Sequence, residues 1–209
     1  MKRSRWDSLI LSISFHASSK VTITTKDTLL EFIKFAKGTV SFYSGFLLHA
    51  PVLIAFKLKL YPNWKAKQRI FSYFFKGMRY TEFCKKGEEF AGIIEKMIHP
   101  SRLNDIRRHQ EDGNTVYVIS ASIDEWVAPW CKEAGIDHVL GTKIEVDGNG
   151  ILTGRFLSPN CYGQEKVNRL LEKEPDRDSY ILYAYGDSRG DRELLAFADK
   201  GIWCNKNAE

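Results

Sequence analysis

Two aspartates, Asp187 and Asp191, stand four residues apart, directly after the apolar run SYILYAY. The turn that holds them contains the small residues Gly186, Ser188 and Gly190. Carboxylate oxygens are the hard ligands that magnesium prefers, and small residues let a backbone approach an ion closely. The pattern indicates an ion site at the tip of a strand. The alternative is that one aspartate only caps the helix predicted over RELLAFA.

A hydroxyl ends another strand-like segment. The run TVYVIS, Thr115 to Ser120, is β-branched and aromatic and short enough for a buried parallel strand. At its end, Ser120 and the following Ala121 could hold a phosphate oxygen, helped by the amide groups and dipole of the next helix. The alternative is an ordinary helix N-cap at this serine-rich junction.

A third candidate is Lys166, early in the helix predicted over GQEKVNRLLEKE. An ammonium group near a helix start opposes the helix macrodipole, so the position is slightly unfavourable for the helix itself. Held over a site, the same ammonium could neutralise a phosphate. The alternative is a surface lysine.

These residues require strands that end at a common edge. Leu9 to Phe15 reads as a first strand, and residues from about 28 to 111 show helical spacing throughout. From Thr115 onward strands and helices alternate, with a hairpin turn at Asp147 to Gly150. This order predicts an α/β fold whose parallel sheet is covered on both faces and binds ligands at the carboxyl ends of its strands. We expect a core of residues 1–27 and 112–209 and a helical insert of residues 28–111.

The composition fits a single domain with a substantial core. The chain has 209 residues, 44% of them hydrophobic, and a net charge of +5 whose basic excess lies mostly between Lys57 and Lys86. Such a region suits an anionic small molecule or a solvated face, and no nucleic-acid-binding pattern accompanies it. The four cysteines form no C-x-x-C pair and are typical of reduced thiols, so we expect a cytoplasmic protein.

The segment from Gly38 to Phe56 contains no Asp, Glu, Lys or Arg and approaches membrane-spanning length. Its serines and glycines, together with His49 and a central Pro51, favour a kinked pair of buried helices over a membrane span. Membrane contact is therefore not expected from the sequence, and the sequence is silent on oligomeric state.

The order of these motifs resembles that of a known family. A strand ending in Ser120, then Lys166 at a loop–helix junction, then GD-x3-D resembles motifs two, three and four of the haloacid dehalogenase (HAD) superfamily. The segments VISASIDEWVAPWCKEAGID, GTKIEVDGNGILTGRF and NCYGQEKVNRL are similar to its subfamily IB, the phosphoserine-phosphatase-like branch. The resemblance runs from about Thr22 to Asn205. It implies a Rossmann-like core and an inserted all-helical (C1-type) cap.

The resemblance also implies roles. Asp187 and Asp191 would form the Mg²⁺ site, the first as ligand and the second as support. Ser120, Ala121, Lys166 and Thr22 would hold the phosphoryl group of a small phosphorylated molecule. Such enzymes hydrolyse phosphomonoesters through an aspartyl-phosphate.

The first motif of the family, Asp-x-Asp-x-Thr, is degenerate here. The chain has Ser18-Ser19-Lys20-Val21-Thr22, so Ser18 occupies the nucleophile position and Lys20 the acid/base position. A serine hydroxyl needs an adjacent base to attack phosphorus, and a lost carboxylate weakens magnesium binding. We therefore expect impaired hydrolysis. Two interpretations remain open: a non-catalytic phosphate- or metabolite-binding protein, or an altered N-terminal sequence.

Overall fold

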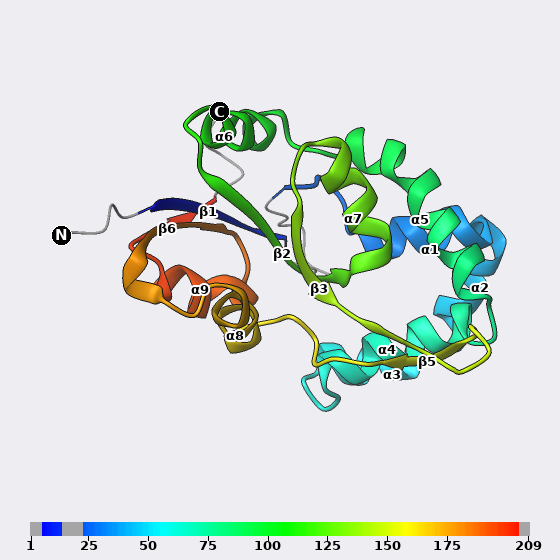
Figure 1. Ribbon diagram of the computed structural model, residues 1–209. Coiled ribbons are helices and arrows are strands. Elements are labelled where there is room, and N and C mark those ends of the chain that lie inside the picture. The colour runs from blue at the N-terminus through cyan, green and yellow to red at the C-terminus, as the bar shows by residue number, and fades with distance from the viewer. Residues whose placement is uncertain (1–5, 14–22, 205–209) are drawn as a thin grey trace.

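A five-stranded parallel sheet forms the centre of the molecule, in the order β3-β2-β1-β6-β7 (Figure 1). The computed structural model describes residues 6–13 and 23–204. The strands are β1 (Trp6–Ile13), β2 (Thr115–Ile123), β3 (His138–Thr142), β6 (Tyr180–Gly186) and β7 (Lys200–Trp203). The predicted parallel sheet is confirmed, and β1 begins three residues before the predicted first strand.

Helices cover both faces of this sheet. Along β2, Val116 and Val118 pack into one apolar cluster with residues of α6 (Pro100–Glu111) and α7 (Asp124–Glu133). The alternate residues Tyr117 and Ile119 pack into a second cluster with α8 (Gln164–Lys173) and α9 (Arg192–Phe197). Because successive side chains of a strand point to opposite faces, burial on both sides explains the continuous apolar run of β2. Two short 3-10 turns, η1 (Arg177–Ser179) and η2 (Arg189–Asp191), flank β6.

Residues 28–111, between β1 and β2, are largely helical, as predicted. They comprise α1 (Thr28–Lys37), α2 (Thr39–Leu48), α3 (Ala50–Lys57), α4 (Asn63–Phe75), α5 (Tyr80–Glu95) and α6. The backbone bridges Thr24 to Ile98 at the two ends of α1–α5, and the His99 amide donates to the Ile23 carbonyl at 2.7 Å. Beyond this bridge α6 packs against β2. These contacts favour a boundary near His99, while the predicted limits 28 and 111 stay a prediction.

An aromatic cluster joins the helical insert to the core. Phe32 of α1 stacks on Trp126 of α7 with ring centroids 4.5 Å apart, and packs edge-on against Phe83 and Phe90 of α5. On α5, a Cβ added at Gly87 would stand 2.1 Å from the Glu125 carbonyl oxygen of α7. The glycine therefore permits close contact between α5 and α7, and this half of the insert is packed firmly on the core.

The hairpin of β4 (Ile144–Val146) and β5 (Leu152–Phe156) reaches from the core to α4 (Figure 1). The Phe156 amide donates to Gln68 Oε1 at 2.9 Å, and Gly154, with φ of 81°, lies against Ser72. Asp147 Oδ1 accepts the Asn149 and Ile151 amides, both at 2.9 Å, and so closes the turn. The predicted hairpin and its turn are confirmed.

Helices α2 and α3 form the predicted kinked pair, with a bend of 64° between them and Pro51 in the first turn of α3. The prediction that they are buried is wrong. Only Gly45 is buried in α2, and no residue is buried in α3. Helix α2 packs on α1 and α4, while Val40 and Leu47 on its remaining surface stay exposed. Among the described residues, no single helix has the length and apolar character of a membrane span; α2 and α3 meet both criteria jointly, across their bend.

Candidate active site

The carboxyl ends of three strands meet at one edge of the sheet. Ile13, the last residue of β1, pairs in register with Ser120 of β2, and β6 lies on the other side of β1. The carboxyl ends of β1, β2 and β6 therefore lie at the same edge of the sheet. Three predicted site residues, Ser18, Lys20 and Thr22, lie outside the described residues.

Asp191 is completely buried and organises the loop after β6. Its Oδ2 accepts the Ser188 amide at 2.9 Å, the Ser188 hydroxyl at 2.7 Å and the Asp187 amide at 3.2 Å. Asp191 and Ser188 form a reciprocal capping box around η2, but the Asp191 side chain makes no cap hydrogen bond to α9. Its carboxylate therefore caps η2 rather than α9, and helix capping stays the alternative for Asp187. Its carboxylate fixes the loop that presents Asp187.

The two glycines of this loop are required by packing. A Cβ on Gly186 would stand 2.5 Å from Cβ of Asp191, and a Cβ on Gly190 would stand 2.4 Å from the ring of Tyr162. The small residues therefore allow the loop to fold back tightly on the Asp191 carboxylate, rather than only leaving space for an ion.

Lys166 joins the loop after β6 to the end of β2. The side chain is fully buried, so the surface-lysine alternative is wrong. Its Nζ donates to Asp191 Oδ1 at 2.8 Å and to the Ile119 carbonyl at 3.1 Å. The helix that carries it begins after Gly163, whose φ is 63° and whose amide donates to the Gly190 carbonyl at 2.9 Å.

The end of β2 is equally buried. Ser120 and Ser122 are both 0% exposed, and Ser120 Oγ accepts the Ser122 amide at 2.9 Å. The N-cap of α7 is Ile123, which has no capping side chain, so the N-cap alternative for Ser120 is wrong. The carbonyl of Ala121 accepts the Thr142 hydroxyl at 3.1 Å. The structure thus brings the β2 end, Lys166 and the loop after β6 to one place.

Lys67 of α4 reaches this place from the helical insert and was not singled out from the sequence. Its buried Nζ donates to the Ala121 carbonyl and, at 3.3 Å, to Asn160 Oδ1. Burial lowers the pKa of Lys67 to about 8, opposed by the charge of Asp27. Burial likewise raises the pKa of Asp27 to about 6. The available signal was helical spacing, because Lys67 falls on the face of α4 that also carries Ile70 and Phe74.

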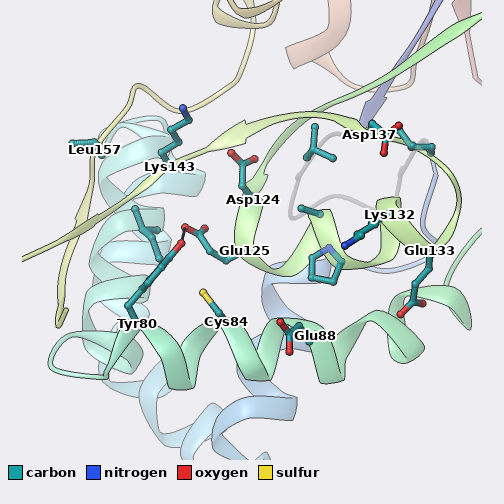
Figure 2. A pocket seen from close by; sticks show the side chains of 15 residues that line it. Tyr80, Cys84, Glu88, Asp124, Glu125, Lys132, Glu133, Asp137, Lys143 and Leu157 are labelled. Carbon is teal, nitrogen blue, oxygen red and sulfur yellow. Dashed lines mark hydrogen bonds between the residues drawn. The ribbon is translucent and has the colours of Figure 1, made fainter.

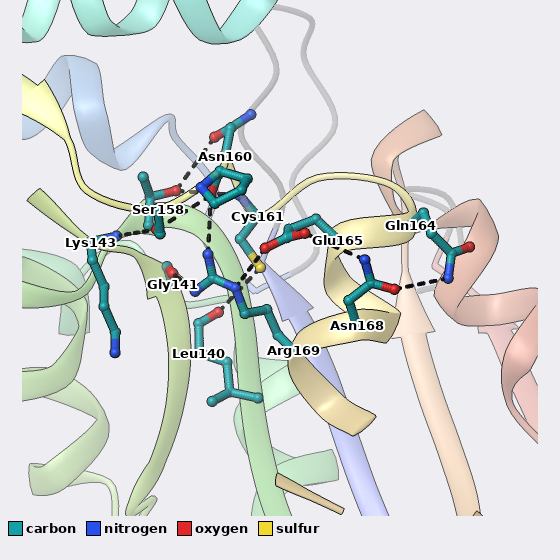
Figure 3. Close-up of polar contacts among 12 residues, drawn as sticks. Leu140, Gly141, Lys143, Ser158, Asn160, Cys161, Gln164, Glu165, Asn168 and Arg169 are labelled. Atoms are coloured by element: carbon teal, nitrogen blue, oxygen red, sulfur yellow. Dashed lines mark hydrogen bonds and ion pairs between the residues drawn. The ribbon is translucent and has the colours of Figure 1, made fainter. Parts of the chain in front are cut away.

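Arg169 supports the loop that carries Asn160 (Figure 3). Its guanidinium donates to the Gly141 carbonyl at 2.8 Å and the Pro159 carbonyl at 3.1 Å, and pairs with Glu165 at 2.8 Å. Sequence reasoning missed it too, although it follows Lys166 by three residues on the same buried face of α8. Arg169 therefore holds in place the loop whose Asn160 accepts a hydrogen bond from Lys67.

The acidic residues at this edge fit a Mg²⁺ ion that takes most of its ligands from water and substrate phosphate. Within residues 23–204, no three His, Cys, Asp or Glu side chains cluster as a metal site. Mg²⁺ is commonly bound through one or two carboxylates together with waters and substrate phosphate. Both oxygens of Asp191 already accept protein donors, which suits a supporting role, whereas Asp187, 3% exposed at the strand tip, suits a ligand.

A separate cavity of ≈ 880 Å³ lies between α5, α7 and the β3–β4 junction (Figure 2). Asp124 and Glu125 project into it beside Tyr80 and Lys143. Burial raises the pKa of Asp124 to about 6 and that of Glu125 to about 7. None of the predicted site residues that the structure describes (Ser120, Ala121, Lys166, Asp187 and Asp191) lines this cavity, so the cavity lies apart from them.

Comparison with known proteins agrees with this architecture. A family model for haloacid dehalogenase-like hydrolases matches residues 21–196. Protein CicA of Caulobacter vibrioides is 31% identical over 180 residues, covering 86% of this chain and 80% of that protein. A histidinol-phosphatase of Neisseria meningitidis is 28% identical over 127 residues, covering 58% and 57%. The chain therefore belongs to the haloacid dehalogenase-like hydrolase family.

Solved structures share the fold at low sequence identity. A Bordetella pertussis protein of unknown function superposes with a TM-score of 0.77 at 16% identity, covering 93% of this chain and 88% of that one. A substrate-bound phosphoserine phosphatase superposes with a TM-score of 0.60 at 18% identity, covering 93% and 84%. The predicted Rossmann-like core with a helical cap is confirmed.

Proposed function

We propose that this protein is a phosphohydrolase scaffold that binds a small phosphomonoester with Mg²⁺ at the joint ends of β1, β2 and β6. The observation that carries the proposal is the buried contact of Lys166 with both Asp191 and the Ile119 carbonyl. It gathers a cation, a hydroxyl-bearing strand end and an acidic loop at one edge of the sheet. The histidinol-phosphatase and phosphoserine phosphatase relatives support a phosphorylated small molecule as ligand.

The proposed roles follow from chemistry and position. Lys166 of α8 and Lys67 of α4 both reach the end of β2 and offset phosphate charge, and Ser120 supplies a hydroxyl. Asp187 holds Mg²⁺, while Asp191 positions the loop. When bound, the metal supplies additional stabilisation of negative charge.

Turnover depends on the first motif, where Ser18 and Lys20 replace the family's aspartates. Their replacement favours the second candidate function, phosphate or metabolite binding without hydrolysis. Both candidate functions use the same phosphate site at the sheet edge and differ in whether a nucleophile is present.

A hydrolysis assay separates the two. We expect the natural chain to release little or no phosphate from p-nitrophenyl phosphate with Mg²⁺, and Ser18→Asp combined with Lys20→Asp to restore release. Efficient release by the natural chain would show that the aspartate pair is dispensable. A double variant that stays inert on this substrate and on a panel of phosphometabolites would refute the catalytic proposal.

A binding assay tests the pocket itself. Phosphate should raise the melting temperature, with a further rise when Mg²⁺ is added. Asp187→Asn should remove the further rise in melting temperature that Mg²⁺ causes. Asp147→Asn, in the exposed β4–β5 turn, should leave that rise intact. If millimolar phosphate changes nothing with or without Mg²⁺, no phosphate site exists at this edge.

A further inference from the structure

The bent helices α2 and α3, with the few residues that follow α3, expose a series of large apolar side chains. Their exposed fractions run from 58% for Ile54 to 84% for Val40. Seven of the twelve most exposed large apolar side chains in the described ranges fall within this short stretch, which we call the apolar face: Val40, Tyr43, Leu47, Leu48, Ile54, Leu58 and Leu60. Contiguous exposed apolar surface of this kind marks an interaction site.

The outward direction of this face is fixed by packing on the other side of α2. A Cβ on Gly45 would stand 2.3 Å from the Phe74 ring, so α2 lies directly against α4. The His49 ring packs edge-on against Tyr73 with centroids 4.8 Å apart. Val40 and Leu47, seven residues apart, lie on the opposite side of the helix and cannot turn inward. In Figure 1, α2–α4 lie on the side of the molecule away from α6 and α9.

The surroundings of the apolar face are positively charged. Between residues 32 and 81 the sequence contains no Asp or Glu and, besides the buried Lys67, eight basic residues: Lys34, Lys37, Lys57, Lys59, Lys65, Arg69, Lys76 and Arg79. Lys57 and Lys59 alternate with the exposed Leu58 and Leu60 at the end of α3. An apolar surface with a basic rim is complementary to a negatively charged, oily partner.

A surface groove beside the bend adds aromatic groups to this rim. Its volume is ≈ 520 Å³, and its lining includes Trp64, Tyr73, Lys65 and Arg69. Trp64 and Tyr73 are 46% and 48% exposed, and Lys65 Nζ lies 5.3 Å from the Trp64 ring centroid. Tryptophan and tyrosine are enriched where proteins meet the headgroup level of a bilayer, and basic groups there contact lipid phosphates.

We propose that the apolar face docks on the surface of an anionic lipid bilayer. Helices α2 and α3 have 10 and 8 residues, which correspond to about 15 and 12 Å, so neither can cross a hydrocarbon core of about 30 Å. Their 64° bend and the packing of α2 on α4 prevent them from forming one straight span. The helices therefore lie along the interface, with their exposed leucines among the acyl chains and their lysines at the headgroups.

A second copy of the chain is a poorer occupant. A twofold interface places the same patch of both subunits face to face, so these eight basic residues of each subunit would oppose their counterparts. A bilayer that contains anionic lipid supplies the opposite charge and an apolar interior. This proposal does not depend on catalysis at the β-sheet edge.

Vesicle flotation of the full chain tests the proposal. We expect it to float with vesicles of phosphatidylcholine and phosphatidylglycerol (7:3), to float weakly with phosphatidylcholine alone, and to be partly released by 0.5 M NaCl because salt screens the lysines. Leu47→Gln with Leu48→Gln should weaken the binding at least tenfold, roughly the effect of withdrawing two partly inserted leucines. Lys57→Gln with Lys59→Gln should weaken binding to anionic vesicles roughly 10- to 30-fold.

Control variants show whether the effect belongs to this face. Lys132→Gln with Lys173→Gln removes two exposed lysines from the core helices α7 and α8 and should leave flotation unchanged. Circular dichroism verifies that each variant is folded. Absence of flotation with anionic vesicles overturns the proposal, as does equal weakening by the control pair. A dimer in light scattering that Leu47→Gln with Leu48→Gln dissociates, without any vesicle binding, would instead assign the face to a second copy.

Discussion

Glu125, at the start of α7, should make the protein less stable as pH rises through neutrality. Its Oε1 accepts the Tyr80 hydroxyl at 3.3 Å, while its buried Oε2 has no hydrogen-bond partner among the described residues. Burial is the main cause that raises the pKa of this carboxyl from 4.5 to about 7, and the charge of neighbouring Asp124 raises it further. The folded protein therefore favours the protonated carboxyl, whereas the unfolded chain ionises it readily.

The magnitude follows from the displacement of the pKa. A rise from 4.5 to about 7 corresponds to roughly 3 kcal/mol of preference for the protonated form. Between these two pH values the folded state holds a proton that the unfolded state releases, so the free energy of unfolding falls as pH rises. This contribution is fully present below about pH 4.5 and is lost above about pH 7.

Glu125→Gln removes the titrating group and keeps an oxygen for the Tyr80 hydroxyl. We expect the variant to gain roughly 3 kcal/mol over the natural protein at pH 8, or about 6–12 °C in melting temperature, and almost nothing at pH 4.5. Urea unfolding at half-unit pH steps measures the difference. The matched control is Glu88→Gln, an exposed residue that lines the same cavity, which should change stability by less than about 0.5 kcal/mol at every pH.

The decisive quantity is the pH dependence of the difference between Glu125→Gln and the natural protein. If that difference stays constant from pH 5 to pH 8, the carboxyl ionises alike in folded and unfolded chains and the reasoning from burial is wrong. A variant that is less stable than the natural protein at pH 8 would show that the charged carboxylate is stabilised by its surroundings.

Three further substitutions test the candidate site. Lys166→Met removes the buried cation beside Asp191, and urea unfolding should show a loss of roughly 3–5 kcal/mol, partly recovered when Asp191→Asn is added. Gly186→Ala places a Cβ 2.5 Å from Cβ of Asp191 and should cost about 1–3 kcal/mol by the same assay, whereas Gly148→Ala meets nothing within 4 Å and should be neutral. Lys67→Met removes a buried ammonium whose pKa burial lowers to about 8, so at pH 7 the melting temperature should stay equal or rise while the phosphate-induced shift becomes smaller; scanning fluorimetry measures both.

The spacing of apolar residues and the residue types of the turns were sufficient to predict the α/β architecture. Strand β2 is buried on both faces, and β6 is buried on one face and at least half-buried on the other, which is why neither sequence alternates between apolar and polar residues. The Asp147–Gly150 turn was visible because its residues form the turn by local hydrogen bonds. By contrast, the burial of α2 and α3 was predicted wrongly. Apolar composition reports a preference for removal from water, but it does not say which neighbour covers the helix.

At the site, Ser120 and Asp191 were found from sequence because each lies at or just after the end of a strand, and Lys166 was found because it begins a helix behind a Gly-containing loop. Lys67 and Arg169 were missed for a different reason. Each reaches its partner across tertiary contacts, Lys67 at the Ala121 carbonyl and Arg169 at the Gly141 carbonyl, and spacing along one helix does not encode those distances. A charged residue on an otherwise apolar helix face was the available sign of both.

Helix α4 connects the two proposals physically. Its inward face sends Lys67 to the Ala121 carbonyl, while its outward face carries Lys65 and Arg69 beside the bend of α2 and α3. An apolar groove of ≈ 190 Å³, lined by Phe56 of α3 among others, has Asp27 and Lys67 in its wall. One 13-residue helix therefore carries both sets of basic groups. Phe75 of the same helix packs on Phe32 of α1 and on Phe83 of α5, so the aromatic cluster that holds α1, α5 and α7 together also holds α4, and with it fixes Lys67 relative to the β2 end.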